Sequence, residues 1–484
     1  MEKNFLINID NYQITTLSNS LKKITSKNPN LYALHCASLK DKKTLKKTFY
    51  FIKNIYCFEE FYLENYKKID INEFEMIEKS LGLTLDELDR SFQSYAKYYV
   101  HPILSSKKRI EMSKKRAILN YKFYSMIFDD FKPNIIIHEH SGGTGSKILW
   151  NLCEKFNCAY YFFKGLYFEK KFIFLDHKDF SYPFFDEKNL KKYSKTEVEV
   201  FKNETLSVNK IAPYEKQAKL FQKVLLLKKF VNFFNRAKIY YSSTAEENYF
   251  YNRFPPILDN IIFYSYTKLR KYFFINFIEE KVSFNTKYVG VFLQVEPELS
   301  TYSLNNNKIS FIDLISTLSK LLPDDYKIYV KEHPSQSINS RFRSLKFFKE
   351  LKKIDNVKIC PLNSNSIDFI KKSQFIATGG GTAVFECIMY NIPCLVFGKH
   401  FYFNFKSVFS IEAAKDISRA INKIKLYKAT EKIEYDNLNF ALNIRDSMLD
   451  GYLFLNNENN NEQKVKSNDE LIFKSLNKFF ELIK

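Results

Sequence analysis

The chain has 484 residues, 45% of them hydrophobic, and a formal net charge of +21. This length is typical of two or three domains with sizeable cores. No apolar run reaches about 18 residues, which argues against a membrane-spanning helix.

The first part of the chain alternates between short apolar runs and helical patterns, which predicts a parallel α/β sheet. The predicted strands are 5–9, 31–35 and 54–58, with helices at 13–24 and 41–53. Residues 71–128 form a long, charged stretch with helical periodicity. Within it, Thr84 and Glu87 form a capping-box pattern. His101-Pro102 lies within this region and is interpreted as a helix break.

A strand at 135–137 and a helix at 146–156 enclose a polar, glycine-containing turn. Glu139 and His140 in this turn are predicted to face a cleft as a general base or a sugar-binding group. The alternative is that they only cap the helix. A metal site is not favoured, because adjacent side chains on extended chain point apart and the spacing places no third ligand.

The next strand is predicted at 159–163, followed by an aromatic and charged stretch, 166–176, that is expected to line the acceptor side. Asp176, at its end, is a second acid/base candidate. Residues 189–273 are mostly helical in pattern, and they form either an acceptor-binding insertion or the helices that link two halves of the protein.

The second half repeats the alternation of strands and helices. Predicted strands are 287–293, 328–330, 357–360, 375–377 and 394–397, and predicted helices are 309–322, 341–353, 366–372, 383–390 and 411–424. Residues 455–469 are of low complexity and predict a mobile loop before a terminal helix at 470–484. We therefore expect an N-terminal domain (1–285), a C-terminal domain (286–455) and a terminal segment (456–484).

Polar residues follow two of these strands. Lys331, Glu332, His333 and Pro334 end the strand at 328–330, because proline cannot donate the next ladder hydrogen bond. Gln294 and Glu298 follow the strand at 287–293, where either they touch a ligand or they form a simple polar loop. Ligands of open α/β sheets bind at the carboxyl ends of the strands. The candidates for a binding site are therefore Lys331, His333, Pro334, Gln294 and Glu298.

A glycine-rich turn, Gly379, Gly380, Gly381 and Thr382, joins the strand at 375–377 to a helix. Backbone N–H groups of such a turn approach an anion closely, and the helix dipole favours negative charge there. Glu386 lies one helical turn after Thr382, where it reaches a sugar hydroxyl while the turn holds a phosphate. The alternative is a generic α/β turn whose glycines only permit tight packing.

These motifs resemble the capsule polysaccharide biosynthesis family of bacterial glycosyltransferases, which are related to Kdo transferases. The resemblance extends over roughly residues 287–402 and rests on His333-Pro334, Gly379 to Thr382, Glu386 and the strand Cys394 to Phe397. It implies a GT-B-like α/β fold, in which two Rossmann-like domains face a cleft and the first carries a helical insertion. It also implies a CMP-activated donor sugar and a loop with Gln294 and Glu298 in the interdomain cleft.

Residue by residue, the resemblance implies that His333 contacts the donor phosphate, that the turn from Gly380 to Thr382 cradles it, and that Glu386 holds the ribose. The Glu-Asp-Gly-Phe element that some members carry in the first domain is absent. The expected function is transfer of a Kdo- or sialic-acid-like sugar from CMP to a surface polysaccharide or glycolipid, without a metal ion. A nucleotide-sugar epimerase of the same fold is the alternative.

The net charge favours anionic partners in general, including phosphates, nucleic acid and anionic lipid. The densest basic cluster, Ser106 to Arg116, is either a solvated helix face or a contact with the inner-membrane leaflet or an anionic glycolipid. A nucleic-acid-binding protein is the least favoured class, because no RNA-binding aromatic motif or helix-turn-helix signature is present.

The seven cysteines are odd in number, form no Cys-x-x-Cys pair and mostly lie in apolar runs. They are predicted to be buried in a reducing compartment. The chain opens with Met1-Glu2-Lys3-Asn4 and shows no signal-peptide pattern. We expect a cytoplasmic protein that is peripheral on the inner membrane if the basic cluster binds lipid.

Overall fold

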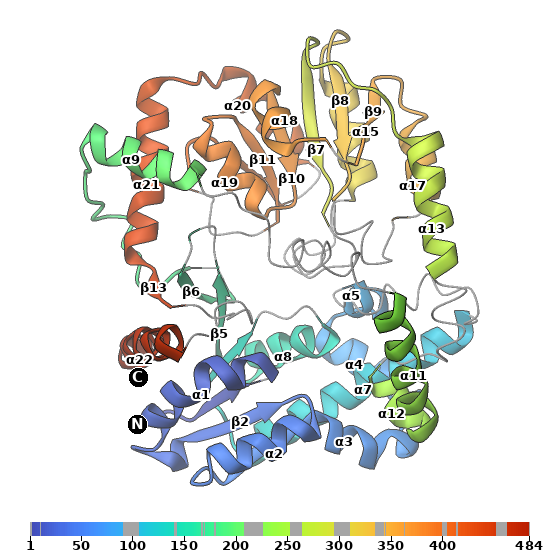
Figure 1. Ribbon diagram of the computed structural model, residues 1–484, viewed down its shortest axis with the longest axis vertical. Coiled ribbons are helices and arrows are strands. Elements are labelled where there is room, and N and C mark those ends of the chain that lie inside the picture. The colour runs from blue at the N-terminus through green and yellow to red at the C-terminus, as the bar shows by residue number, and fades with distance from the viewer. Residues whose placement is uncertain are drawn as a thin grey trace. The chain divides into compact units, whose positions relative to one another are not determined.

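The computed structural model describes most of the chain, which divides into two compact α/β units (Figure 1). The first unit consists of residues 1–88, 110–191 and 442–484, and the second consists mainly of 192–441. The described residues are 2–9, 11–90, 106–139, 143–165, 168, 170–178, 181–207, 226–251, 264–294, 310–333, 343, 345–362, 364–398, 404–412, 415–451 and 462–483.

The sheet of the first unit has the order β13-β6-β5-β4-β1-β2-β3. Neighbouring strands from β1 to β5 run parallel, whereas β6 is antiparallel to both β5 and β13. Counted along the chain, the parallel strands have the order 3-2-1-4-5 of a doubly wound fold. The strands are β1 (Phe5–Asn8), β2 (Tyr32–Cys36), β3 (Asn54–Cys57), β4 (Ile135–Glu139), β5 (Ala159–Gly165), β6 (Lys171–Asp176) and β13 (Leu449–Asp450).

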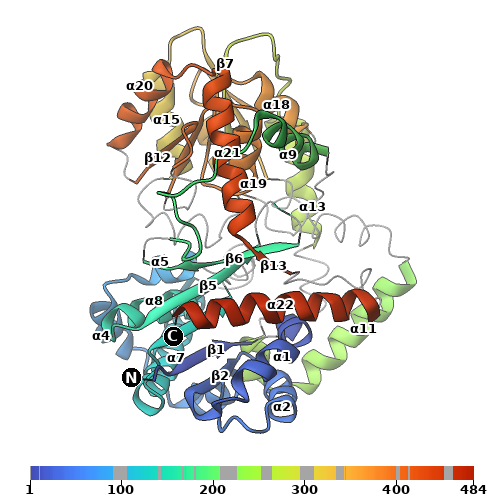
Figure 2. The same cartoon turned by 90° about the vertical axis from the view of Figure 1, so that its left-hand side faces the viewer.

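Alternation along the strands directs one set of side chains toward a core shared with α1 and α22. Phe5 and Ile7 of β1 belong to this core together with Leu476, Phe479 and Phe480 of α22. Figure 2 shows α22 beside α1 along this sheet. The helices of this half are α1 (Asn11–Thr25), α2 (Leu39–Thr48), α3 (Phe58–Asn65), α4 (Glu73–Leu81), α5 (Leu85–Arg90), α7 (Ser106–Asp130), α8 (Thr144–Lys155) and α22 (Glu462–Ile483), with short 3-10 turns at Pro29–Leu31 and Tyr66–Lys68.

All strands of the second unit are parallel, in the order β12-β11-β10-β7-β8-β9. Counted along the chain, this is the order 3-2-1-4-5-6 of a Rossmann sheet. The strands are β7 (Tyr288–Phe292), β8 (Lys327–Lys331), β9 (Val357–Ile359), β10 (Phe375–Thr378), β11 (Cys394–Phe397) and β12 (Val408–Ile411). The predicted α/β class, with two Rossmann-like sheets, is therefore confirmed.

The helices α15 (Phe311–Leu321), α17 (Leu345–Leu351) and α20 (Asp416–Leu426) bury their apolar faces in a core with β7, β8 and β10. Phe369 of α18 (Ser366–Lys372) packs on Tyr288 of β7, and α19 (Thr382–Met389) contacts β10 and β11. The other helices of this part are α9 (Lys195–Ser207), α11 (Leu226–Ser242), α12 (Ala245–Phe250), α13 (Tyr264–Phe273), a π-helix (Phe274–Ile278) and α21 (Glu431–Ser447), which ends in the first unit.

Several sequence predictions need correction. The stretch 166–176 contains the strand β6, and the predicted helix 411–424 starts only at Asp416, because β12 occupies Val408 to Ile411. The terminal helix begins at Glu462, so residues 462–469 are helical rather than a loop. His101 and Pro102 lie outside the described residues.

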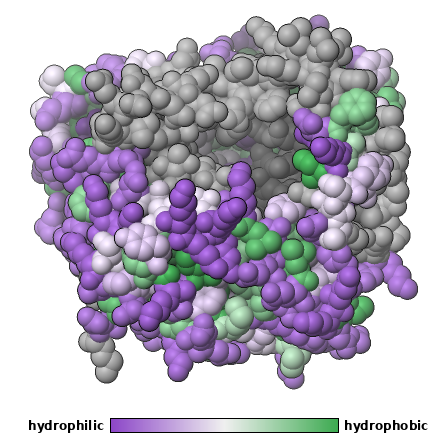
Figure 3. Space-filling view, turned by 60° about the horizontal axis from the view of Figure 1, so that its bottom comes forward, coloured by the Kyte–Doolittle hydropathy of each residue, from purple (hydrophilic) through white to green (hydrophobic). Residues whose placement is uncertain are grey.

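Two predictions about composition can be compared with the structure. All seven cysteines are free and buried, as the sequence predicts. Within the described ranges, no helix is both long and apolar enough to cross a bilayer. The face in Figure 3 is mostly hydrophilic, with small groups of hydrophobic residues between the polar ones.

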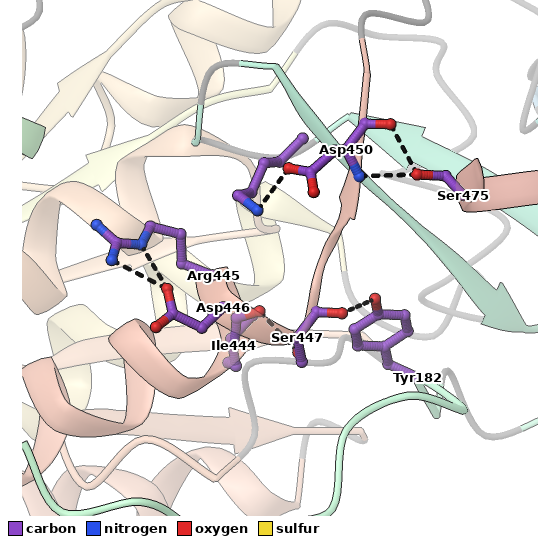
Figure 4. Close-up of polar contacts among 8 residues, drawn as sticks. Tyr182, Ile444, Arg445, Asp446, Ser447, Asp450 and Ser475 are labelled. Carbon is purple, nitrogen blue, oxygen red and sulfur yellow. Dashed lines mark hydrogen bonds and ion pairs between the residues drawn. The ribbon is translucent and has the colours of Figure 1, made fainter. Parts of the chain in front are cut away.

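The chain returns to the first unit at the end of α21, where polar contacts hold it (Figure 4). The Tyr182 hydroxyl donates to the Ser447 carbonyl at 2.6 Å, and Lys171 pairs with Asp450 at 2.8 Å. Ser475 of α22 both accepts from the Asp450 amide and donates to its carbonyl. These contacts, together with the α22 core, assign residues 442–484 to the first unit, whereas the predicted boundaries were at 285 and 455.

Candidate functional site

The candidate site lies in the second unit, at the point where the strand order reverses between β7 and β10. In doubly wound sheets, ligands bind outside the carboxyl ends of the strands at this switch point. Gln294 follows β7, and Gly379 to Thr382 follow β10. Strand β8, which leads to His333, is the next neighbour of β7. The topology thus brings three of the predicted polar segments to one edge of one sheet.

The turn after β10 requires glycine at two positions. Gly380 and Gly381 have φ values of 126° and 87°, in the region that side chains with a Cβ atom rarely adopt. Gly381 is the N-cap residue of α19, and Thr382 at the start of the helix is exposed. Therefore the exposed N-terminus of a helix lies directly behind a strained, side-chain-free turn, which is the geometry of an anion site.

Gln294 lies against this turn, which the sequence alone did not place. A Cβ atom added to Gly379 would come within 2.8 Å of the Gln294 Oε1 atom and 3.1 Å of the Phe397 ring. A Cβ atom on Gly381 would be 3.8 Å from the Gln294 Nε2 atom. The carboxamide is buried, so it forms one wall of the turn.

At the end of β8, a buried ion pair accompanies His333. The Arg343 Nε atom donates to the Glu332 Oε2 atom at 3.1 Å, and the His333 amide donates to Glu332 Oε1 at 2.7 Å. Arg343 also donates through Nη2 to the Gln294 carbonyl at 2.7 Å. Neither Glu332 nor Arg343 was a sequence candidate, and the only signal was the charge of Glu332 next to His333.

Burial sets the protonation of this group. Burial first of all, and also the charge of Lys331, lower the pKa of His333 to about 4. Burial raises the pKa of Glu332, and the His333 amide and the charge of Lys331 oppose this shift. The neighbouring guanidinium of Arg343 also favours the carboxylate. His333 is thus a neutral imidazole at pH 7, able to donate one hydrogen bond to a ligand.

The remaining donor-site predictions are placed only in part. Glu386 is half-buried on α19, one turn beyond Thr382 and on the same side of the helix. Lys331 is the last residue of β8 and is buried. Pro334 and Glu298 lie outside the described residues.

The three catalytic candidates of the first unit are not brought together by the described structure. Glu139 is the last residue of β4, where it pairs with Phe163, and His140 lies outside the described residues. Asp176 ends the antiparallel strand β6 and pairs with Tyr161, toward the opposite edge of the sheet. Its Oδ1 atom accepts from the Lys178 amide at 2.8 Å, as in a local turn.

The first unit has its own buried polar group at the switch point between β1 and β4. The Asn8 Nδ2 atom lies 3.1 Å from the His35 Nδ1 atom, and the His35 ring stacks on His138 at 6.2 Å. Burial and the charge of His138 lower the pKa of His35 to about 3. The described residues contain no group of three or more His, Cys, Asp or Glu side chains that could hold a metal ion.

The basic cluster on α7 is partly engaged in packing. Lys115 lies 4.9 Å from the centre of the Tyr66 ring and pairs with Glu111 at 3.3 Å, while Lys114 lies 5.6 Å from the Phe74 ring centre. Both lysines are half-buried, and Lys107 is exposed. The cluster therefore has a structural role in holding α7, whatever its exposed members bind.

The two sheets define an α/β protein of the doubly wound type, with an anion-binding geometry in its second unit. Residues 203–430 match the family model described as capsule polysaccharide biosynthesis protein. The resemblance stated from the sequence is thereby confirmed over this segment. The match includes the helical region before β7, to which the sequence assigned no chemistry.

Other comparisons are weaker. No curated protein matches the chain. Among solved structures, UDP-GlcNAc 2-epimerase from Methanocaldococcus jannaschii matches with 10% identity and a TM-score of 0.26, over 92% of this chain and 99% of the other. The β-Kdo 2,7 transferase KpsC of Thermosulfurimonas dismutans matches with 11% identity and a TM-score of 0.27, over 66% of this chain and 87% of the other. Anabaena HepE in complex with UDP matches with 10% identity and a TM-score of 0.29, over 98% of this chain and 100% of the other. These TM-scores establish no shared activity.

Proposed function

We propose that the protein is a glycosyltransferase that uses a nucleotide-sugar donor and acts on a surface polysaccharide or glycolipid. The observation that carries this proposal is the glycine turn from Gly379 to Gly381, which opens α19 at the switch point of a Rossmann sheet. The match of residues 203–430 to the capsule polysaccharide biosynthesis family model supports the class of enzyme. On the resemblance given above, the specific donor is a CMP-linked Kdo- or sialic-acid-like sugar.

In this proposal the donor phosphate rests on the amides of Gly380, Gly381 and Thr382. The α19 dipole and the neutral imidazole of His333 offset the negative charge that grows on the leaving nucleotide. Glu386 accepts hydrogen bonds from the ribose hydroxyls. These groups replace a metal ion in stabilising the leaving phosphate, so the reaction is proposed to be metal-independent.

The acceptor is proposed to bind the first unit. Glu139, at the carboxyl end of β4, is the first candidate for the base or nucleophile. His140 and Asp176 are the other candidates, and Glu298 is a candidate contact to donor or acceptor. Peripheral contact with an inner membrane through α7 belongs to the same proposal.

Thermal stabilisation by CMP, UDP, GDP and dTDP tests the donor site. We expect CMP to give the largest rise in Tm and the variants His333→Ala and Glu386→Ala to lose most of it. If no nucleotide stabilises the wild-type protein, the proposed donor site does not exist.

The reaction class is tested separately by incubation with a nucleotide-sugar in the absence of acceptor. A transferase leaves the sugar configuration unchanged, whereas the alternative, a nucleotide-sugar epimerase, interconverts it. Epimerised product without acceptor, detected by NMR, would replace the transferase proposal.

A further inference from the structure

The ion pair Glu332–Arg343 is completely enclosed in the second unit. The exposed fractions of the Glu332 and Arg343 side chains are 0% and 4%. Enclosing two charges costs desolvation energy that their attraction alone seldom returns. A buried pair of this kind is therefore better explained by what it holds in place than by its contribution to stability.

A polar path leads from Arg343 to both sides of the candidate site. Through Nη2 it holds the Gln294 carbonyl at 2.7 Å, and through Nε it holds Glu332 at 3.1 Å. Glu332 in turn accepts from the His333 amide at 2.7 Å. One guanidinium thus connects the residues that follow β7, a strand at the switch point, with those that follow its neighbour β8.

A second path runs through aromatic rings to the glycine turn. The Arg343 guanidinium lies 4.8 Å from the centre of the Phe347 ring and 5.8 Å from that of Phe311. Phe311 packs edge-on against Phe397 at 5.1 Å. Phe397 lies 3.1 Å from the position of a Cβ atom on Gly379. The same guanidinium therefore supports the turn from its other side.

We infer that Arg343, with Glu332, is a positioning residue that sets His333 and the Gln294 carboxamide against the phosphate-binding turn. This inference rests on the proposed function. Arg343 is buried, and its Nε and Nη2 atoms donate to Glu332 and Gln294, so the inferred role acts through these neighbours. Lysine cannot replace it, because a single ammonium lacks the planar fork that reaches Gln294 and Glu332 together.

The test uses the full-length protein and titration calorimetry with CMP and UDP as probes. For Arg343→Lys and Glu332→Gln we expect at least a tenfold weaker Kd for the nucleotide that stabilises the wild type. Leu314→Ala is the matched control, because Leu314 is fully buried in the core of the same unit and lies on α15. The Leu314→Ala variant should lower Tm as much as Arg343→Lys does, but it should change the Kd for the nucleotide by less than twofold.

A double-mutant comparison separates positioning from loss of stability. In a His333→Ala background, Arg343→Lys should weaken nucleotide binding by less than a further threefold. The reason is that the imidazole of His333, one of the groups that Arg343 positions, has already been removed. The loss of Tm should stay additive.

Two outcomes overturn the inference. If Arg343→Lys behaves as Leu314→Ala does, while His333→Ala and Gly380→Ala lose nucleotide binding, the donor site stands and the positioning role fails. If neither CMP nor UDP binds the wild-type protein, the proposed function fails and the inference fails with it.

Discussion

The two sheets of this protein share the strand order 3-2-1-4-5, yet their switch points contain different chemistry. In the second unit, a glycine turn, Gln294 and a buried ion pair surround the reversal. In the first unit, the buried polar side chains there are Asn8, His35 and His138, and the pKa of His35 is lowered to about 3. The shared strand order therefore determines where the polar groups lie, and the identity of the side chains determines which ligands they can bind.

The comparison also separates two ways to bury polar groups. The second unit keeps full charges and satisfies them with each other, which makes the geometry rigid and the loss of either partner costly. The first unit uses the imidazole of His35, whose lowered pKa keeps it uncharged at neutral pH at the expense of acid stability. The predictions below measure this difference, from the largest effect to the smallest.

Replacing Arg343 with Met should lower the free energy of unfolding of the second unit by about 3–5 kcal/mol, because Glu332 is left buried without its cation. Hydrogen exchange of the β7 and β8 amides would measure the loss. Lys406, whose side chain is 57% exposed and pairs with Asp436, is the control. Lys406→Met should change stability by no more than about 1 kcal/mol. Equal losses would show that Arg343 is not buried as described.

Replacing a closely packed glycine with alanine should lower stability in both units but weaken nucleotide binding only in the second. Gly379→Ala places a Cβ atom 2.8 Å from Gln294, and Gly145→Ala places one 2.5 Å from Asn120. Each should cost about 1–3 kcal/mol in stability. Only Gly379→Ala should also weaken nucleotide binding, by at least tenfold in calorimetry. A similar loss of affinity in Gly145→Ala would contradict the assignment of the donor site to the second unit.

Acid should weaken the first unit through His35. Its pKa is about 3 in the folded protein and about 6.5 in the unfolded chain. Below pH 6.5 the unfolded chain takes up a proton that the folded protein does not, so stability falls as pH falls. The loss from pH 6.5 to 5.0 should be about 2 kcal/mol.

The fluorescence of Trp150, the one tryptophan in the sequence, reports on this unit during urea unfolding. His35→Gln should remove most of the extra loss between pH 7.5 and 5.0. An unchanged pH dependence in this variant would mean that other groups control acid stability.

The smallest effects should come from helix caps. Ser38 accepts from the Asp41 amide at 3.1 Å in the first unit, and Asn365 accepts from the Ile367 amide at 2.9 Å in the second. Replacing either with Ala should cost about 1 kcal/mol. Ser38→Ala should shift the urea midpoint seen by Trp150, and Asn365→Ala should not. Equal shifts would show that the two units unfold as one.

Much of the fold could be predicted because its strands are short apolar runs that end at a glycine, a proline or a charged residue. The strand before His333 and the one before Gly379 are examples, and both lie within one residue of their predicted bounds. Strand β6 was missed because aromatic residues and lysines hide its alternation, and β12 because its apolar residues adjoin a helical pattern. Residues 462–469 are the first turns of a helix whose later residues, from Ile472 onward, pack on the first unit, and a local pattern does not report this packing.

The candidate site was predictable only where its chemistry follows a strand directly. Gly379 to Thr382 and His333 meet this condition. Arg343 is separated from Glu332 by eleven positions, and nothing local relates it to either strand end. The buried role of Glu332 was also missed, because a carboxylate beside lysine and histidine is typical of a solvated loop. Such pairings depend on the tertiary fold and are invisible to spacing.

The return of the chain to the first sheet has a consequence for synthesis. Phe479 and Phe480 of α22 fill the core that β1 and α1 begin, and β13 extends the sheet edge beside β6. The amino-terminal half leaves the ribosome with that hydrophobic surface uncovered and keeps it so until the last residues emerge. A chain released early, without residues 442–484, would expose it permanently and become a substrate for chaperones and proteases.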